Sequence, residues 1–265
     1  MKTGLIITAL LFSTSSLAST GLDPAKTEYG FDAWPRDASL RQGLGLGSVD
    51  LSPYVEHSRR NHLATSGEMI VRYREANGTS PALEIAIMVQ DSVSGAQEHL
   101  LSVLSASTIH LPRAGDLGLC VGDVSFASGN VVIDTVLFTR ANVYVRVTRI
   151  GSGPDIAAIA SRIDARILSE KKAKSAKQLA KPRIEKLSAP SSALPGQAVP
   201  IALEVTDPSG SEVDLLFDEG GAMVYREDGR WYFYAEMPLD YTVTLYALND
   251  HFLVSKRSFS VKVIP

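Results

Sequence analysis

The stretch KKAKSAKQLAKPRIEKLSAPSSALPGQ, residues 171–197, separates two parts of the chain that follow different patterns. It begins with closely spaced lysines and continues through Pro182, Pro190 and Pro195. Proline lacks a backbone N–H and ends a helix, so helical structure cannot continue through this stretch. In a chain of 265 residues the break indicates two small domains joined by a Lys/Pro-rich linker over residues 171–196.

Only strand patterns follow the linker. Six short segments with turn signals between them read AVPIALEVTD, EVDLLFD, GAMVYRE, RWYFYAE, YTVTLYALN and FLVSKRSFSVKVI. This regular spacing predicts an all-β sandwich over residues 197–265. Tyr241 stands before an alternating strand, as the buried tyrosine of a tyrosine corner does.

Residues from about 182 to 265 resemble a bacterial immunoglobulin-like or fibronectin-type module. The matching segments are PGQAVPIALEVTDPSG, DGRWYFYAEM, DYTVTLYALND and FSVKVIP. The chain departs from antibody domains because it has no cysteine pair, and because Leu215, Leu216 and Phe217 stand where a core tryptophan would be. The resemblance implies a spacer or a surface that binds protein or glycan.

Residues 65–170 mix strands and helices. In EMIVRYREANGTSPALEIAIMVQD, pairing Val71 with Ile85 matches the apolar side chains and sets Arg72 opposite Glu84. This register needs an odd-numbered loop centred near Gly78 rather than a tight two-residue turn.

Two helices are indicated by apolar residues at helical spacing, within residues 91–107 and 153–168. Three strands lie between them: LGLCVGDVSFA, VVIDTVLFT and VYVRVTRI. The order β-β-α-β-β-β-α predicts an α+β domain, an antiparallel sheet with both helices on one face.

With both helices on one face, the other face would be exposed and unusually apolar. The candidate binding residues on it are Arg72, Arg74, Tyr144 and Arg146. One interpretation is that residues 19–64, an irregular arm, or the second domain covers this face. The other is a partner groove in which the arginines face an anionic ligand.

Residues 1–18, MKTGLIITALLFSTSSLA, read as a signal peptide cleaved near Ala18. We therefore expect a periplasmic or secreted protein that is soluble after cleavage, with no transmembrane segment in the mature chain. The single cysteine, Cys120, excludes an internal disulfide. Its flanking apolar residues favour a buried position in a strand; a nucleophile and an intermolecular bridge are the alternatives.

The sequence contains no catalytic motif, no metal-ligand spacing and no cofactor-binding motif. A formal net charge of −3 argues against a nucleic-acid partner. The leading hypothesis is a non-catalytic binding or accessory protein that contacts a protein or polysaccharide of the bacterial envelope. The alternatives are an envelope-directed hydrolase whose active site is assembled from distant residues, and a structural subunit that docks through the sandwich edge strands.

The lysines of the linker have two interpretations. The acidic sandwich tethered beside them is the simplest partner, which predicts a loose, salt-sensitive joint between independently folding domains. The alternative is that the lysines bind an anionic lipid or polysaccharide.

Overall fold

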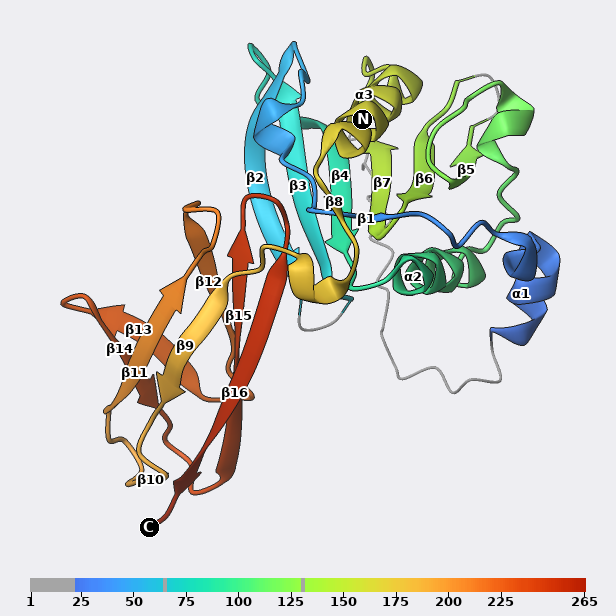
Figure 1. Cartoon of the computed structure of the whole chain (residues 1–265). Coiled ribbons are helices and arrows are strands. Elements are labelled where there is room, and N and C mark those ends of the chain that lie inside the picture. The colour runs from blue at the N-terminus through green and yellow to red at the C-terminus, as the bar shows by residue number, and fades with distance from the viewer. Residues whose placement is uncertain (1–21, 64–65, 130–131) are drawn as a thin grey trace.

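The protein, as a computed structural model, consists of two bodies joined end to end (Figure 1). The structure describes residues 22–63, 66–129 and 132–265, so the expected signal peptide lies outside the described residues. Within this part of the chain, no helix has the length and hydropathy needed to cross a membrane.

The first body holds these elements in chain order: α1 (Asp23–Tyr29), η2 (Phe31–Ala33), β1 (Leu40–Arg41), η3 (Leu46–Ser48), β2 (Tyr54–His62), β3 (Glu68–Glu75), β4 (Pro81–Val89), α2 (Val93–Ser105), η4 (Ala114–Leu117), β5 (Val124–Ser128), β6 (Thr135–Arg140), β7 (Val143–Arg149) and α3 (Ile156–Ser169). The connection contains β8 (Lys172–Ala173) and η5 (Ala176–Gln178). The second body holds β9 (Arg183–Ser188), β10 (Ser192–Ala193), β11 (Val199–Thr206), β12 (Val213–Asp218), β13 (Met223–Glu227), β14 (Arg230–Tyr234), β15 (Asp240–Asn249) and β16 (Val254–Val263).

The first body is built on a six-stranded antiparallel sheet with strand order β2-β3-β4-β7-β6-β5. The predicted register of the first hairpin is confirmed, with Val71 opposite Ile85 and Arg72 opposite Glu84. Its loop, residues 76–80, is centred on Gly78. Apolar matching across the pair therefore outweighed the tight turn that Asn-Gly favours.

The two long helices lie on opposite faces of this sheet, so the prediction that both share one face is wrong. Side chains of α3 pack with Val71, Val145 and Phe138. Side chains of α2 pack with Met88 and Tyr144. Both faces of β4, β6 and β7 are apolar, and a sheet of this kind needs cover on each side. Helical spacing alone does not reveal which face a helix covers.

The expected irregular arm is largely structured. Residues 54–62 form β2, the outer strand of the sheet, which corrects the reading of residues 19–64 as irregular. Tyr29, Phe31 and Trp34 pack with α2 on the face that carries Tyr144. Part of the arm thus covers this sheet face, as the first of the two interpretations had it.

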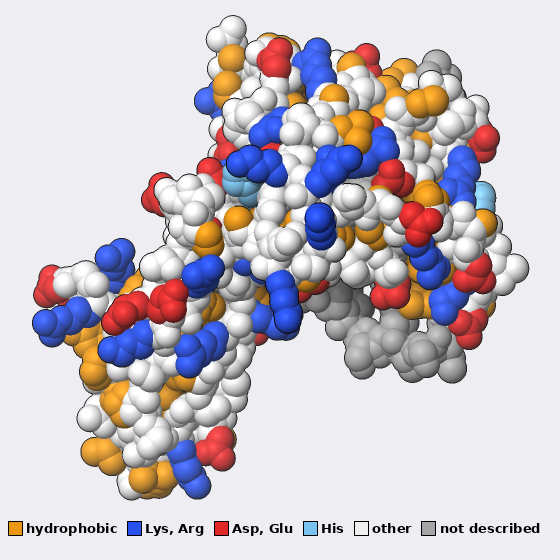
Figure 2. Space-filling view, in the orientation of Figure 1, with side chains coloured by type: hydrophobic (Ala, Val, Ile, Leu, Met, Phe, Trp, Pro, Cys, Tyr) orange, Lys and Arg blue, Asp and Glu red, His pale blue; other side chains and the backbone are white. Residues whose placement is uncertain are grey.

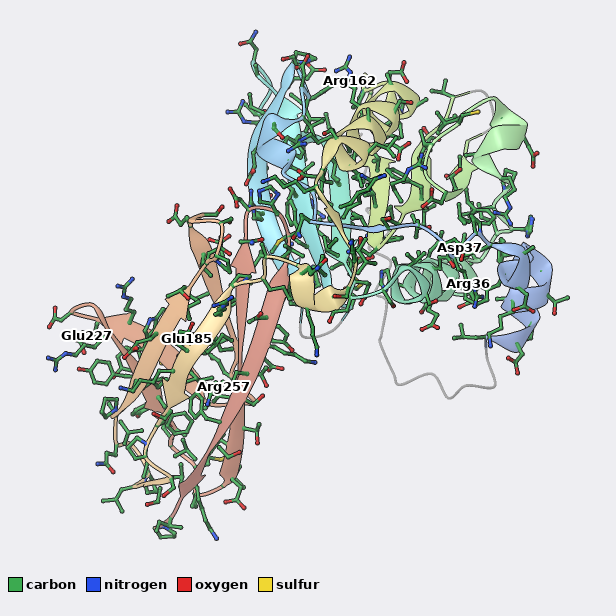
Figure 3. The ribbon with its side chains drawn as sticks, in the orientation of Figure 1. Arg36, Asp37, Arg162, Glu185, Glu227 and Arg257 are labelled. Atoms are coloured by element: carbon green, nitrogen blue, oxygen red, sulfur yellow. The ribbon has the colours of Figure 1, made fainter. Side chains whose placement is uncertain are left out.

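The second body is a β-sandwich of two four-stranded sheets, β10-β16-β15-β12 and β13-β14-β11-β9. All six predicted strands are present, as β11 to β16. The sandwich begins earlier than expected, because β9 lies inside the predicted linker and pairs with β11. On the side of β9 and β16, Arg257 donates hydrogen bonds to the carbonyl oxygens of Ile184 and Glu185 (Figure 3).

Tyr241 occupies the position expected of a tyrosine corner. Its side chain is 5% exposed, and its ring meets Phe233 nearly edge-on. The hydroxyl donates a hydrogen bond to the carbonyl oxygen of Met237, four residues upstream, at 3.1 Å. A buried ring with a satisfied hydroxyl stabilises the end of the sandwich that lies far from the first body.

The two bodies meet along an apolar joint formed by the turn between β15 and β16. Leu248 and Phe252 belong to the same hydrophobic cluster as Leu44 and Leu46 of the first body. Leu253 packs with Ala173 and Leu179 of the connection in a second cluster. The joint is therefore made mainly by burial of apolar side chains, and the ion pair Arg59–Asp214, at 3.8 Å between exposed side chains, lies beside it.

Backbone contacts fix the same joint. The amide of Leu44 donates to the carbonyl oxygen of His251 at 3.0 Å. At Gly43, which has φ of +102°, a Cβ atom would lie 2.1 Å from that oxygen, so only glycine allows the two chains to approach this closely. Residues 171–186 form two ion pairs within the described part of the chain, Lys181–Asp91 and Lys186–Glu204. Lys181 pairs with the first body, and Lys186 lies in β9, so its pair with Glu204 of the adjacent β11 is internal to the sandwich. Neither pair is the expected contact in which linker lysines hold the sandwich against the first body.

Replacing Phe252 by alanine should lower the free energy of unfolding by about 3–5 kcal/mol, the usual cost of a large cavity in a core. Phenylalanine and alanine would both adopt the positive φ of +59° at position 252. The difference in unfolding free energy therefore reports lost packing rather than backbone strain. Urea unfolding measures it. Leu194→Ala, at a side chain that is 55% exposed, is the control and should change stability by less than about 0.5 kcal/mol. Equal effects of the two variants would contradict an apolar joint.

Candidate functional site

The four residues predicted on an exposed sheet face lie on β3 and β7, but one of them is buried. Tyr144 exposes none of its surface, because α2 lies over it. The ring of His99, on α2, meets the Tyr144 ring edge-on with 4.6 Å between centroids. Burial raises the pKa of the Tyr144 phenol. The expectation that Tyr144 faces solvent is therefore wrong.

Arg72 and Arg146 lie together in a network with two carboxylates. The Nε of Arg72 is 2.9 Å from Glu84, and a terminal nitrogen of Arg146 is 3.5 Å from Glu68 and 3.9 Å from Glu84. Burial works against the charge of Arg146, but Tyr144 and the two carboxylates outweigh it and raise the pKa of the guanidinium. An anionic ligand at this place would have to compete with Glu68 and Glu84.

Glu68 is the most buried member of this network, with 5% of its surface exposed. The Nε2 atom of His99 lies 3.0 Å from its carboxylate. Burial opposes ionisation of Glu68, but the hydrogen bond from His99 and the charge of Arg146 outweigh it and lower the pKa of Glu68. These contacts attach α2 to β3 and β7.

Arg74 does not belong to the network. It donates hydrogen bonds to the carbonyl oxygens of Glu75, Ala76 and Gly78, which closes the loop between β3 and β4. The structure thus brings together Arg72, Tyr144 and Arg146 and separates Arg74 from them. Binding by any of these four residues stays a prediction, and each already has an internal structural role.

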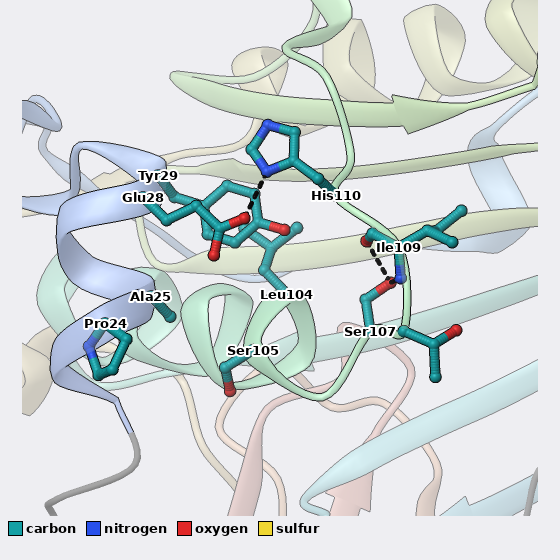
Figure 4. Close-up of a pocket in the computed structure, with 10 residues that line it drawn as sticks. Pro24, Ala25, Glu28, Tyr29, Leu104, Ser105, Ser107, Ile109 and His110 are labelled. Carbon is teal, nitrogen blue, oxygen red and sulfur yellow. Dashed lines mark hydrogen bonds and ion pairs between the residues drawn. The ribbon is translucent and has the colours of Figure 1, made fainter.

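A groove of about 250 Å³ lies between α1 and the end of α2 (Figure 4). In it, Nδ1 of His110 is 2.7 Å from Glu28, and the His110 ring stacks on Tyr29 with 5.0 Å between centroids. The His110 and Glu28 side chains are 56% and 50% exposed. Exposed pairs of this kind are common on surfaces and contribute little energy.

A larger cleft of about 380 Å³ lies at the joint between the two bodies. Its polar wall includes Asn249, whose amide nitrogen donates to the carbonyl oxygen of Ala180 and to Asp207. The Asn249 side-chain oxygen accepts hydrogen bonds from the amides of His251 and Leu253. This amide is fully used in holding the joint, so it has no free group for a ligand.

Within residues 22–63, 66–129 and 132–265, no three His, Cys, Asp or Glu side chains lie close enough together to hold a metal ion. Cys120 is exposed, in the segment between η4 and β5. The expectation that it is buried in a strand is wrong, because β5 begins only at Val124.

The outer face of the sandwich sheet β13-β14-β11-β9 carries a group of aromatic side chains. Tyr225 on β13 and Tyr232 on β14 are directly opposite each other, and their rings stack with 5.6 Å between centroids at an angle of 21°. Pro200 on β11 lies opposite Tyr232 on the other side, and it is exposed. With strands about 4.8 Å apart, these three residues form a row roughly 10 Å long across the sheet.

A second row lies beside the first, with Tyr234 opposite Met223, whose surface is 52% exposed. The hydroxyl of Tyr234 donates to Glu236 at 3.1 Å, and this hydrogen bond raises the pKa of the phenol. Figure 2 shows hydrophobic side chains gathered on this part of the sandwich. We call the surface formed by Pro200, Met223, Tyr225, Tyr232 and Tyr234 the tyrosine face.

The tyrosine face was not expected from the sequence, although the sequence contains a signal for it. Because side chains alternate along a strand, RWYFY sends Trp231 and Phe233 to one face and Tyr232 and Tyr234 to the other. Trp231 and Phe233 pack in the sandwich core. A strand with four consecutive aromatic residues has more of them than one buried face can use.

Comparisons with known proteins provide no family for this chain. No protein-family model matches it, and no curated protein sequence matches it. Among solved structures, it is similar to the fibronectin(III)-like modules of Clostridium thermocellum CbhA, with 16% identity over 53% of this chain and 84% of that one, at a TM-score of 0.26. A chimeric titin Z1Z2 carrying a decorin peptide is similar at 9% identity over 75% and 88% of the two chains, with a TM-score of 0.25.

Replacing Glu68 by glutamine should make stability depend less steeply on pH in acid. The pKa of Glu68 is lowered in the folded protein, so its contribution is complete above the ordinary pKa of 4.5 and is lost as the pH falls through the folded value. Urea midpoints measured between pH 7 and pH 3 report this. The matched control is Glu98→Gln, at an exposed position of α2, which should keep the slope of the natural protein. An unchanged slope in Glu68→Gln would show that Glu68 is not held in its charged form.

Proposed function

We propose that the protein is a non-catalytic binding or accessory protein of the bacterial envelope, and that it holds a polysaccharide chain on the tyrosine face. The proposed localisation in the envelope rests on residues 1–18, whose pattern predicts export. The binding role rests on a single observation, the stacked pair Tyr225 and Tyr232 on the outer surface of the sandwich.

The arrangement of the rings favours a polymer that lies flat. The face of an aromatic ring is planar and electron-rich, so it attracts the weakly positive C–H groups on the flat side of a sugar ring. Pro200, Tyr232 and Tyr225 offer such surfaces on three adjacent strands. A linear chain can therefore make several stacking contacts in a row across the sheet.

Polar groups surround the apolar surface. At one end lie the hydroxyl of Tyr234 and the carboxylate of Glu236. At the other end, Glu227 and Arg230 are opposite each other beside the turn between β13 and β14. Sugar hydroxyls need donors and acceptors at the rim of such a platform, because an unpaired buried hydroxyl is costly. Arginine and carboxylate side chains supply both.

Retention on insoluble polysaccharides tests the proposal. Purified peptidoglycan, chitin and cellulose are incubated with the full chain and with the variants Tyr225→Ala and Tyr232→Ala. Each ring should contribute about 1–3 kcal/mol, by analogy with stacked bases, so each variant should lose roughly fivefold or more in affinity.

Tyr246→Ala is the matched control, since Tyr246 lies on β15 in the opposite sheet. It should bind as the natural protein does. Undiminished retention of Tyr225→Ala and Tyr232→Ala would contradict the proposal. Capture of an envelope protein by the same face, without retention on any polysaccharide, would assign the face to a protein partner.

A further inference from the structure

The connection between the two bodies displays four lysines whose side chains have no partner within residues 22–63, 66–129 and 132–265. Lys171, Lys172, Lys174 and Lys177 are exposed, and none forms an ion pair or side-chain hydrogen bond within the described part of the chain. Residues 166–183 contain seven cationic side chains and one acidic side chain. The whole chain has a net charge of −3, so this surface is positive although the molecule as a whole is negative.

The backbone that carries these lysines is fixed. β8 pairs with β1, with Ala173 opposite Leu40, and the amide of Gln42 donates to the carbonyl oxygen of Lys171. Ala173 is 2% exposed and Leu179 is 7% exposed, so these two residues attach the segment to the core. Lys172 and Lys174 flank Ala173 in an extended segment and therefore point away from it, toward solvent.

The nearby acidic groups are already used by other cations. Glu170, which is 8% exposed, lies 2.6 Å from Arg166. Asp91 lies 2.5 Å from Lys181. The positive charge of the four lysines is consequently uncompensated at the surface, and Figure 2 shows Lys and Arg side chains along the segment between the two bodies. An external anionic surface would compensate it.

An exposed apolar side chain lies next to the lysines in the chain. Leu168, near the end of α3, is 46% exposed and precedes Lys171 by three residues. A leucine beside a cluster of lysines suits the boundary between lipid headgroups and acyl chains, where apolar and cationic side chains are both stabilised. A soluble polyanion would gain nothing from the leucine.

We propose that Lys171, Lys172, Lys174 and Lys177, together with Leu168, form a surface that binds reversibly to anionic phospholipid. Attraction to anionic headgroups contributes roughly a fivefold factor in affinity for each lysine near the membrane surface. It falls with rising salt, because exposed charges are screened. The proposal stands on a different surface from the tyrosine face and does not depend on it.

Co-sedimentation of the full chain with vesicles tests the proposal. Vesicles of phosphatidylglycerol and phosphatidylethanolamine are compared with neutral phosphatidylcholine vesicles, at about 50 mM and about 500 mM salt. The natural chain should bind the anionic vesicles at low salt and lose most of this binding at high salt. The variant with the four lysines changed to glutamine should bind the anionic vesicles with at least tenfold lower affinity at low salt. Binding to anionic vesicles that is unchanged in this variant overturns the proposal.

The control changes four lysines elsewhere, Lys26, Lys186, Lys256 and Lys262, to glutamine, which alters the net charge equally. The affinity of this control for anionic vesicles should fall less than threefold. A fall equal to that of the first variant would show that only net charge matters and would overturn the proposal. Leu168→Ser should weaken binding to vesicles and leave retention on alginate, an anionic polysaccharide, unchanged. Retention on alginate without any binding to anionic vesicles would overturn the lipid assignment in favour of an anionic glycan.

Discussion

The side-chain amide of Asn249 shapes the turn whose apolar side chains form the joint between the two bodies. It is 2% exposed and takes part in four hydrogen bonds, to the amides of His251 and Leu253, the carbonyl oxygen of Ala180 and the carboxylate of Asp207. These bonds shape the turn that places Phe252 and Leu253 against the first body and its connection. A buried amide that is fully satisfied is stabilising and specific, whereas an incomplete network would be costly.

The joint determines how the two candidate surfaces are presented. β8 and η5 are attached to the first body through β1 and Gln42, and β9 follows directly into the sandwich. Lysines that read as a flexible linker therefore project from a fixed backbone. On the sandwich, the tyrosine face lies on a sheet whose inner side chains are packed in the core. We propose that the protein is a binding scaffold with two surfaces, one aromatic and one cationic.

Much of the fold follows from side-chain alternation. The register that pairs Val71 with Ile85, and the one that pairs Phe138 with Val145, are fixed because a slip by one residue would expose apolar side chains. The six strands of the sandwich and the hydroxyl contact of Tyr241 follow from the same kind of pattern. β2 was missed because an outer strand with mostly exposed, polar residues shows little apolar alternation. The position of α2 was missed because the apolar second face of the sheet does not say what covers it. For the same reason, Tyr144 was expected to face solvent. Tyr225 and Tyr232 were not expected to form a surface, because they lie in two neighbouring strands that are rich in aromatic residues.

Apolar packing, rather than charge attraction, holds the two bodies in one arrangement. Small-angle X-ray scattering of the full chain as salt is raised from about 50 mM to about 1 M tests this directly, since the screening length shortens roughly fourfold over this range. Our account predicts the same radius of gyration and the same distance distribution at every salt concentration. A progressive expansion with salt would contradict it and would show that the two bodies are held by charges.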